Sequence, residues 1–149
     1  MRARGPAWWV AGCAALLMGG CIAPAVDQGA FEQNAKSALE SASSETATAR
    51  LAVDGLLSGR ATSAYADTVV TDSENAMGGV QTSFGVVDPP SRDQDRLRDQ
   101  VLTLLGNADD ALAHTRIALR RNDDKALRSA LQELDNSTSQ LTKAREALR

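Results

Sequence analysis

Apolar and small side chains recur at steps of three and four along most of the chain, which is the spacing of one face of an α-helix. The first stripe begins at Phe31 and stops before Ser58-Gly59, where glycine can take the left-handed conformation that ends helices. Its members are Phe31, Ala35, Ala38, Ala42, Thr46, Ala49, Val53 and Leu56, widened by Leu39, Leu51 and Leu57. For the polar segment Ser41 to Thr48, a partly unfolded helix is the alternative.

A second stripe follows Thr62 or Ser63, either of which can accept hydrogen bonds from the first free amides of a helix. It comprises Tyr65, Val69, Asp72, Ala76, Val80, Phe84 and Val87, with Asp72 as a polar interruption. Gly78-Gly79 predicts a weak point, with a bend, fraying or a close helix approach. Asp88-Pro89-Pro90 stops the helix, because proline disfavours helical geometry in the residue before it.

The third stripe is the clearest, and Ser91 with Gln94 three residues later predicts a capping box that opens it. Its members are Leu97, Val101, Leu104, Ala108, Leu112, Thr115 and Leu119, flanked by Leu102, Leu105 and Ile117. Leu104 is its predicted central core position. Asn122 can end this helix, and Asp123 or Asp124 can cap a fourth one with Leu127, Leu131, Leu134, Thr138, Leu141, Ala144 and Leu148 on its apolar face.

Long helices joined by short loops must run alternately up and down. The chain is therefore predicted to be all-α, with an antiparallel up-down four-helix bundle over residues 29–149. Strand-like alternation does not extend beyond a few residues.

Residues 1–20 have the three parts of a secretory signal: Arg2 and Arg4, an apolar run from Ala7 to Met18, and then small residues. An apolar run of 12 residues is shorter than the about 20 needed to cross a bilayer. Residues 21–28 then form a short linker to the bundle.

The sequence Met18-Gly19-Gly20-Cys21 resembles a bacterial lipobox, although Met18 stands where leucine is usual. The resemblance implies that Cys21 receives a diacylglyceryl group and that cleavage occurs just before it. Val10-Ala11-Gly12-Cys13 matches the consensus better but leaves only Pro6 to Trp9 as a preceding apolar run. The Ala-rich, Arg-rich and Lys-poor composition is similar to that of small, functionally uncharacterised lipoproteins of actinobacterial envelopes.

The composition of the chain further restricts the chemistry and the partners that the protein can have. The whole chain has 16 Lys and Arg against 19 Asp and Glu, and five aromatic residues. Cleavage before Cys21 removes Arg2 and Arg4, which leaves 14 basic against 19 acidic residues, a net charge of -5, and one cysteine. This excludes disulfide chemistry, and an acidic chain with no basic stripe or interleaved aromatic residues argues against nucleic acid as a partner.

His114, the only histidine, lies four residues after Asp110 and beside Asp109 in the helical register. A metal site of the ferritin-like type needs a second His and more glutamates, so an exposed or boundary His is the preferred interpretation. One His and no Gly-x-Ser-x-Gly elbow also disfavour a serine nucleophile. No catalytic, cofactor-binding or metal-binding residue is predicted.

Two charged clusters carry functional alternatives. Asp67, Asp72 and Glu74 either face a cation or form a solvated face, which we prefer. Arg116, Arg120, Arg121 and Arg128 either contact an acidic partner or, as we expect, offset the helix dipole and pair with Asp123 and Asp124.

The expected protein is a non-catalytic lipoprotein that is held through Cys21 at the extracytoplasmic face of the cell membrane and acts as an interaction or adaptor module with an envelope protein. The alternative is a small-molecule-binding or metal-binding bundle. Convergence of Thr46, Asp72, Thr115 and Thr138 on one internal cavity would favour that alternative.

Overall fold

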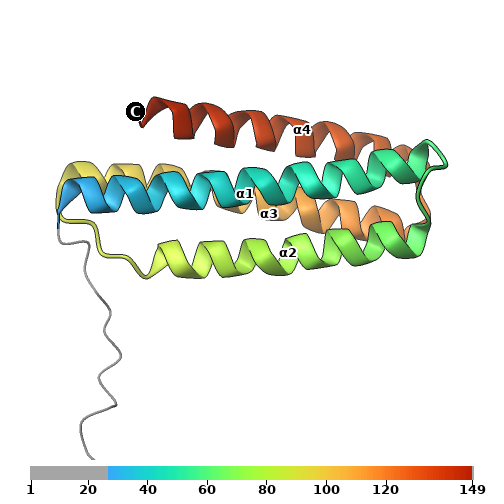
Figure 1. Ribbon diagram of the computed structural model, residues 1–149, viewed down its shortest axis with the longest axis horizontal. Coiled ribbons are helices and arrows are strands. Elements are labelled where there is room, and N and C mark those ends of the chain that lie inside the picture. Colours follow the sequence, from blue (N-terminus) through green and yellow to red (C-terminus); the bar gives the residue numbers. More distant parts are fainter. Residues whose placement is uncertain (1–26, 149) are drawn as a thin grey trace, which may run out of the picture.

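A computed structural model describes residues 27–148 and contains four helices. They are α1 (Gln28–Leu57), α2 (Ser63–Gly85), α3 (Arg92–Arg121) and α4 (Asp124–Ala147). The helices run alternately in opposite directions along one long axis (Figure 1), so the predicted four-helix bundle is confirmed. None of the described helices combines the length and the apolar character that crossing a bilayer requires.

Helix α1 ends as the sequence predicted, and it begins at a cap, Asp27, that was expected to belong to the linker. The Asp27 carboxylate accepts a hydrogen bond from the Ala30 amide (2.8 Å) and so caps the start of α1. At its end, Gly59 has a φ of +72°, and the amides of Gly59 and Arg60 donate to the carbonyls of Leu56 and Gly55. This is a Schellman motif, and it needs the left-handed conformation that glycine adopts without strain.

The turn between α3 and α4 is equally local in origin. Asn122 has a φ of 50°, and side-chain amides tolerate this left-handed region better than most residues. The Asp123 side chain then accepts from the Ala126 amide (3.0 Å) at the start of α4. Of the two candidate caps for α4, Asp123 is the one used. Thr62 likewise caps α2, accepting from the Tyr65 amide (3.2 Å).

The predicted capping box at Ser91 is wrong in one respect. Ser91 is the N-cap of α3, but its side chain makes no capping hydrogen bond. Gln94 is buried, and its amide nitrogen donates to the Glu32 carboxylate of α1 (3.3 Å) instead of turning back to its own helix. The start of α1 lies beside the start of α3, so a tertiary partner replaces the local one.

Helix α2 ends at Gly85, before the two prolines. In a continuing helix the Gly85 carbonyl would accept from the amide of residue 89, but Pro89 has no N–H. Arg98 of α3 donates to this carbonyl through its guanidinium. A side chain from the next helix thus satisfies a backbone acceptor that the sequence leaves free.

The buried face of α1 matches the prediction closely. Seven members of its stripe, from Phe31 to Val53, are buried, together with Leu39 and Ala52. Segment Ser41 to Thr48 is helical throughout, so the partly unfolded alternative is wrong. Leu51 does not widen the stripe, because its side chain is 65% exposed on the outer surface.

The face predicted for α2 is right at Phe84, which is buried, and at Val69, Val80 and Val87, which pack against the core, but it is wrong by one position elsewhere. Its buried residues are Ala66, Val70, Ser73, Met77 and Phe84, whereas Tyr65, Asp72 and Ala76 are exposed. Both registers have helical spacing, and α2 has small or polar residues on each. Met77 fills the space that Ala76 would leave empty, so packing volume selects the register.

A similar exchange occurs on α3. Leu105 is fully buried, whereas Leu104 is only partly buried. Ala111 and Ala118 join the core, which also holds Val101, Ala108, Leu112 and Leu119. Leu105 therefore takes the central position predicted for Leu104. On α4 the buried positions are Leu127, Ala130, Leu134, Ser137 and Leu141.

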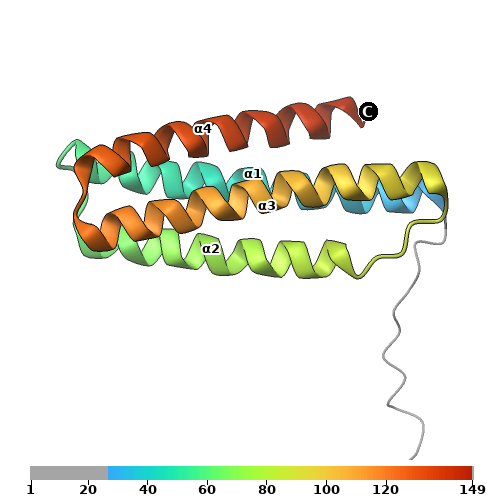
Figure 2. The ribbon, with the colours of Figure 1, turned by 180° about the vertical axis from the view of Figure 1, so that it is seen from behind.

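Helices α1 and α3 touch across the centre, whereas α2 and α4 lie at opposite corners and do not contact each other. The two long helices have 30 residues each, about 45 Å, and α4 has 24. Figure 2 shows that α4 ends before the end of the bundle where α1 and α3 begin, and that it diverges from them on the way. Within residues 27–148, all four helices contribute side chains to one apolar core cluster.

Candidate functional site

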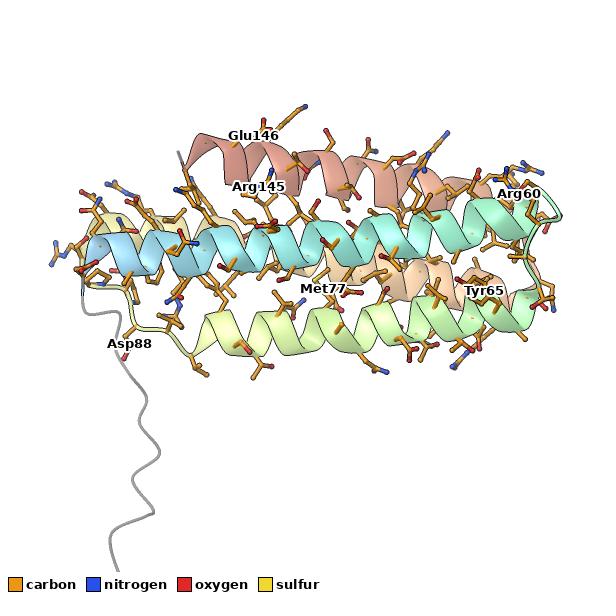
Figure 3. The ribbon with its side chains drawn as sticks, viewed as in Figure 1. Arg60, Tyr65, Met77, Asp88, Arg145 and Glu146 are labelled. Atoms are coloured by element: carbon orange, nitrogen blue, oxygen red, sulfur yellow. The ribbon has the colours of Figure 1, made fainter. Side chains whose placement is uncertain are left out.

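The proposed lipid attachment at Cys21, the alternative Cys13 and the signal segment 1–20 lie outside the described residues. The structure does place the point where this part of the chain enters the bundle. Asp27 precedes α1 at the end that also holds the α2–α3 connection, where Asp88 is labelled in Figure 3. Arg60 and Tyr65 lie at the opposite end.

His114 lies at the edge of α3, as predicted, because Ala111, Leu112 and Thr115 take the neighbouring inward positions. Its carboxylate partner is not Asp110 of the same helix but Glu133 of α4, with Nδ1 and Oε2 3.0 Å apart. The two side chains are 63% and 45% exposed. Between residues 27 and 148, no group of three His, Cys, Asp or Glu residues has the geometry of a metal site.

The acidic and basic clusters meet each other across the α2–α3 interface. The Arg116 guanidinium contacts both carboxylate oxygens of Glu74, with Nη2 and Oε1 3.0 Å apart. Arg120 and Asp67 lie 3.7 Å apart on the next turns. Pairing of the arginines with Asp123 and Asp124 was the wrong expectation: Asp123 is used as a helix cap, and α2 supplies the carboxylates.

The Arg116 and Glu74 side chains are only 25% and 22% exposed, so solvent screens this pair incompletely. The contact with Glu74 raises the pKa of Arg116 further. Close by, burial raises the pKa of the Asp109 carboxyl, and the negative charges of Glu74 and Asp110 add to the effect. Asp72 is exposed and takes no part, so the three acidic residues do not form one cation site.

The four polar residues that distinguish the two functional hypotheses do not converge. Thr46 of α1 and Thr138 of α4 share a hydrogen bond of 2.7 Å, and Thr115 donates to the Ala111 carbonyl of its own helix. Asp72 faces solvent. Both hydroxyl protons of this threonine pair have an acceptor, because Thr46 can donate to Thr138 while Thr138 donates to the Leu134 carbonyl (2.8 Å).

The threonine pair belongs to a polar seam along the α1–α4 interface. It is flanked by Ser43 with Thr142 (3.3 Å), by Arg50 with Asp135, and by Arg145 with Glu40 (3.6 Å). As the α1 number rises the α4 number falls, so the seam fixes the antiparallel register of the two helices. Figure 3 shows Arg145 on the side of α4 that faces α1 and Glu146 on the opposite side. These groups serve the fold.

Grooves with room for a ligand lie along two of the helix interfaces in the described part of the chain, α1–α2 and α3–α4. One, of about 430 Å³ between α1 and α2, has a rim of small polar residues that includes Ser37, Ser41 and Ser83. Gly79 also lines it, but a Cβ on Gly78 or Gly79 would meet nothing within 4 Å. The expected close helix approach at this glycine pair is therefore wrong, and so is the expected fraying, because α2 is helical through both residues.

The second groove lies between α3 and α4 and has a volume of about 510 Å³. Its lining is mostly aliphatic, with Leu97, Leu104 and Leu148 among its members. Sequence reasoning assigned all three leucines to the core and so missed the groove. The available signal was Ala144, a small residue in the α4 stripe where the preceding turns have leucine.

Comparison with known protein families, with curated proteins and with solved structures finds no match to this chain. The sequence identified His114 and both charged clusters but not how they pair, His114 with Glu133 and Arg116 with Glu74, because the partners are 19 or more positions apart in the chain.

Proposed function

We propose that this protein is a lipid-anchored, non-catalytic helical bundle on the extracytoplasmic face of the cell membrane, where it acts as an interaction or adaptor module for another envelope protein. The observation that carries the proposal is the position of the lipobox-like Met18-Gly19-Gly20-Cys21. It lies six residues before Asp27, the cap that opens α1. The two or three acyl chains of a bacterial lipoprotein give stable anchoring, whereas one chain alone does not.

The distribution of reactive side chains supports a non-catalytic role. The only imidazole is exposed and has one carboxylate partner, Glu133. The least exposed ion pair of the described residues, Arg116 with Glu74, joins two helices, and its guanidinium contacts both carboxylate oxygens. A general base needs a substrate atom within hydrogen-bond reach and a neighbouring group that stabilises the transition state. The charged side chains of these clusters are instead paired with one another, His114 with Glu133 and Arg116 with Glu74.

The alternative, a bundle that binds a small molecule or a metal, gains one specific observation. Thr46, Asp72, Thr115 and Thr138 do not meet in one cavity, so a polar ligand has no common site among them. The aliphatic groove between α3 and α4 favours an apolar ligand instead.

The anchor is tested with Cys21→Ser in cells that are fed an alkyne-tagged palmitate. Wild-type protein should carry the tag and partition into the detergent phase of a Triton X-114 extract, whereas the variant should lose both properties. Cys13→Ser is the matched control and should behave as the wild type. Lipid that persists in Cys21→Ser, or that is lost in Cys13→Ser, would overturn the assignment of Cys21.

The interaction role is tested by placing a photoreactive amino acid at exposed positions on different helices. Leu51, Tyr65 and Ile117 are suitable because their side chains point away from the core. Irradiation of intact cells should give a discrete adduct with one envelope protein, and Cys21→Ser should remove it by releasing the bundle from the membrane. Diffuse adducts from all three positions would count against a specific partner.

A further inference from the structure

The groove between α3 and α4 is lined by residues that the sequence pattern predicts to be part of the core. Its α3 wall consists of Leu97, Val101 and Leu104, and its α4 wall of Ala144 and Leu148, with Leu39 of α1 below. Leu97, Leu104 and Leu148 are only partly buried although each lies on the apolar stripe of its helix. Helix α4 diverges from α3 toward its C-terminal end (Figure 2), and the three leucines line the groove there.

The chemistry of the lining selects an aliphatic ligand. The polar members, Asp99, Gln100 and Thr103, come from exposed positions of α3 and form a rim on one side. In the described part of the chain, the buried polar atoms that lack a hydrogen-bond partner belong to Arg50, Asp67, Gln94 and Arg98, and none of these residues lines the groove. A bound molecule therefore finds apolar surface and no buried polar group to recognise.

The residues that line the groove also extend along the axis of α3. From Leu97 to Leu104 it follows α3 for about 10 Å, since each residue advances a helix by about 1.5 Å. The long walls are two antiparallel helices, so the space runs parallel to the axis of the bundle. An acyl chain fits this description because it is linear, flexible and free of hydrogen-bonding groups.

The position of the groove indicates which acyl chain fills it. Residues 22–26 separate Cys21 from the Asp27 cap, and the six steps from Asp27 back to Cys21 reach at most about 20 Å at roughly 3.3–3.6 Å per residue. The start of α3 lies beside the start of α1, as the contact between Gln94 and Glu32 shows. Leu97 is one helical turn further along α3, within reach of the tether.

We infer that the α3–α4 groove binds an acyl chain attached to Cys21 of the same molecule; the inference rests on the proposed lipidation. Tethering raises the effective concentration of the chain at the groove to the millimolar range, which favours binding even to a shallow groove. A sheltered chain is withdrawn from the bilayer. In a lipoprotein with two acyl chains, one chain then remains in the bilayer, and because one chain holds a protein only marginally and reversibly, occupation of the groove weakens the anchor.

The test supplies the acyl chain chemically. Residues 21–149, which contain the complete core cluster, have Cys21 as their only cysteine. The thiol is alkylated with a hexadecyl maleimide that carries a diazirine in its alkyl chain, the monomeric protein is irradiated, and the crosslinked residues are mapped by mass spectrometry. The expected result is an intramolecular crosslink concentrated at Leu97, Leu104 and Leu148.

Two groove variants and one matched control make the result specific. Leu104→Gln and Leu148→Gln should each lower the intramolecular crosslink yield about tenfold, because an amide without a partner opposes an apolar chain. Leu51→Gln makes the same change at an exposed position outside the groove and should leave the yield unchanged. Circular dichroism verifies folding, and Leu148→Gln, in the last turn of the chain, protects the test against a misfolded Leu104 variant.

Three outcomes would overturn the inference. Crosslinks spread evenly over the surface would show that the acyl chain is unbound. Crosslinks between molecules would show that the groove binds a second copy. Equal yields in all three variants would show that the groove is not the binding site. Failure of the proposed function would be seen separately, as missing palmitate label on Cys21 in cells, since the alkylated protein does not depend on cellular lipidation.

Discussion

The two halves of α3 carry the same kind of apolar stripe but meet different surroundings. In the C-terminal half, from Leu105 to Leu119, the stripe is closed by its neighbours and Leu105 and Leu112 are fully buried. In the N-terminal half, Leu97 and Leu104 stay partly exposed along the α3–α4 groove. The apolar stripe therefore identifies the helix face that packs toward the core, and the side chains of the facing helix determine how completely that face is buried.

The facing residues on α4 explain the difference. The closed half lies opposite the part of α4 that supplies Leu127, Leu134 and Leu141, all buried. The open half lies opposite Ala144 and the final turn, where α4 is both smaller in side-chain volume and further away. Polar contacts do not follow this division: Arg116 with Glu74 and His114 with Glu133 use the closed half of α3, whereas Gln94 with Glu32 and Arg98 with the Gly85 carbonyl use the open half.

The largest expected effect compares adjacent leucines on the two sides of this division. Leu105→Ala should lower the free energy of unfolding by about 2–5 kcal/mol, because the buried side chain leaves a cavity. Leu104→Ala should cost about 1 kcal/mol, since part of its surface already meets water. Urea titrations followed by circular dichroism measure both, and equal losses would mean that the groove is closed in solution.

A smaller loss is expected from the ion pair that joins the closed half to α2. Glu74→Gln should lower the free energy of unfolding by about 1–2 kcal/mol, because the Arg116 guanidinium loses its carboxylate while solvent only partly replaces it. Asp93→Asn is the control, since its ion pair with Arg96 is exposed. A loss as large in Asp93→Asn would show that burial of the Arg116 pair contributes nothing.

Filling the open half should have the opposite sign. Ala144→Leu places a larger side chain in the groove and should raise the free energy of unfolding by about 0.5–2 kcal/mol, as cavity-filling substitutions commonly do. The exposed Ser44→Leu adds the same side chain outside both large grooves and should stay within about 0.5 kcal/mol of the wild type. A destabilised Ala144→Leu would indicate that α4 already packs closely there.

The closed half should also show a pH dependence that originates at Asp109. Its raised pKa means that the folded state holds this proton more tightly than the unfolded chain does, so ionisation of Asp109 costs stability as the pH rises from about 4. Asp109→Asn should remove this decline and be the more stable protein at neutral pH. Melting temperatures of both proteins from pH 3 to pH 8 measure the slopes; parallel curves would contradict the prediction.

The smallest effect is expected at His114. His114→Gln should change the free energy of unfolding by no more than about 1 kcal/mol, because the ring is largely exposed and the carboxylate beside it, Glu133, also stays in contact with solvent. Elemental analysis of the purified wild-type protein should find no stoichiometric transition metal. One bound metal per chain that disappears in His114→Gln would promote the metal-binding alternative.

The sequence by itself determined the local features of this protein. The helix ends at Gly59, Thr62, Asn122 and Asp123 were predictable because each depends on the conformation or hydrogen bonding of a few consecutive residues. The α1 stripe was predictable for a related reason: Phe31 and Val53 bound a face that has only one apolar register. The edge position of His114 followed from its buried neighbours on the same turn.

Only the tertiary structure decided features that depend on what faces a residue. The register of α2, the exchange of Leu104 for Leu105 and the groove all follow from the volume and distance of side chains on another helix. Gln94 donates to Glu32 instead of capping its own helix, and Arg116 pairs with Glu74 instead of Asp123. Helical periodicity repeats every few residues and fixes a face, but contacts between distant segments are set when whole helices pack, and that packing is not encoded in any one stretch of the chain.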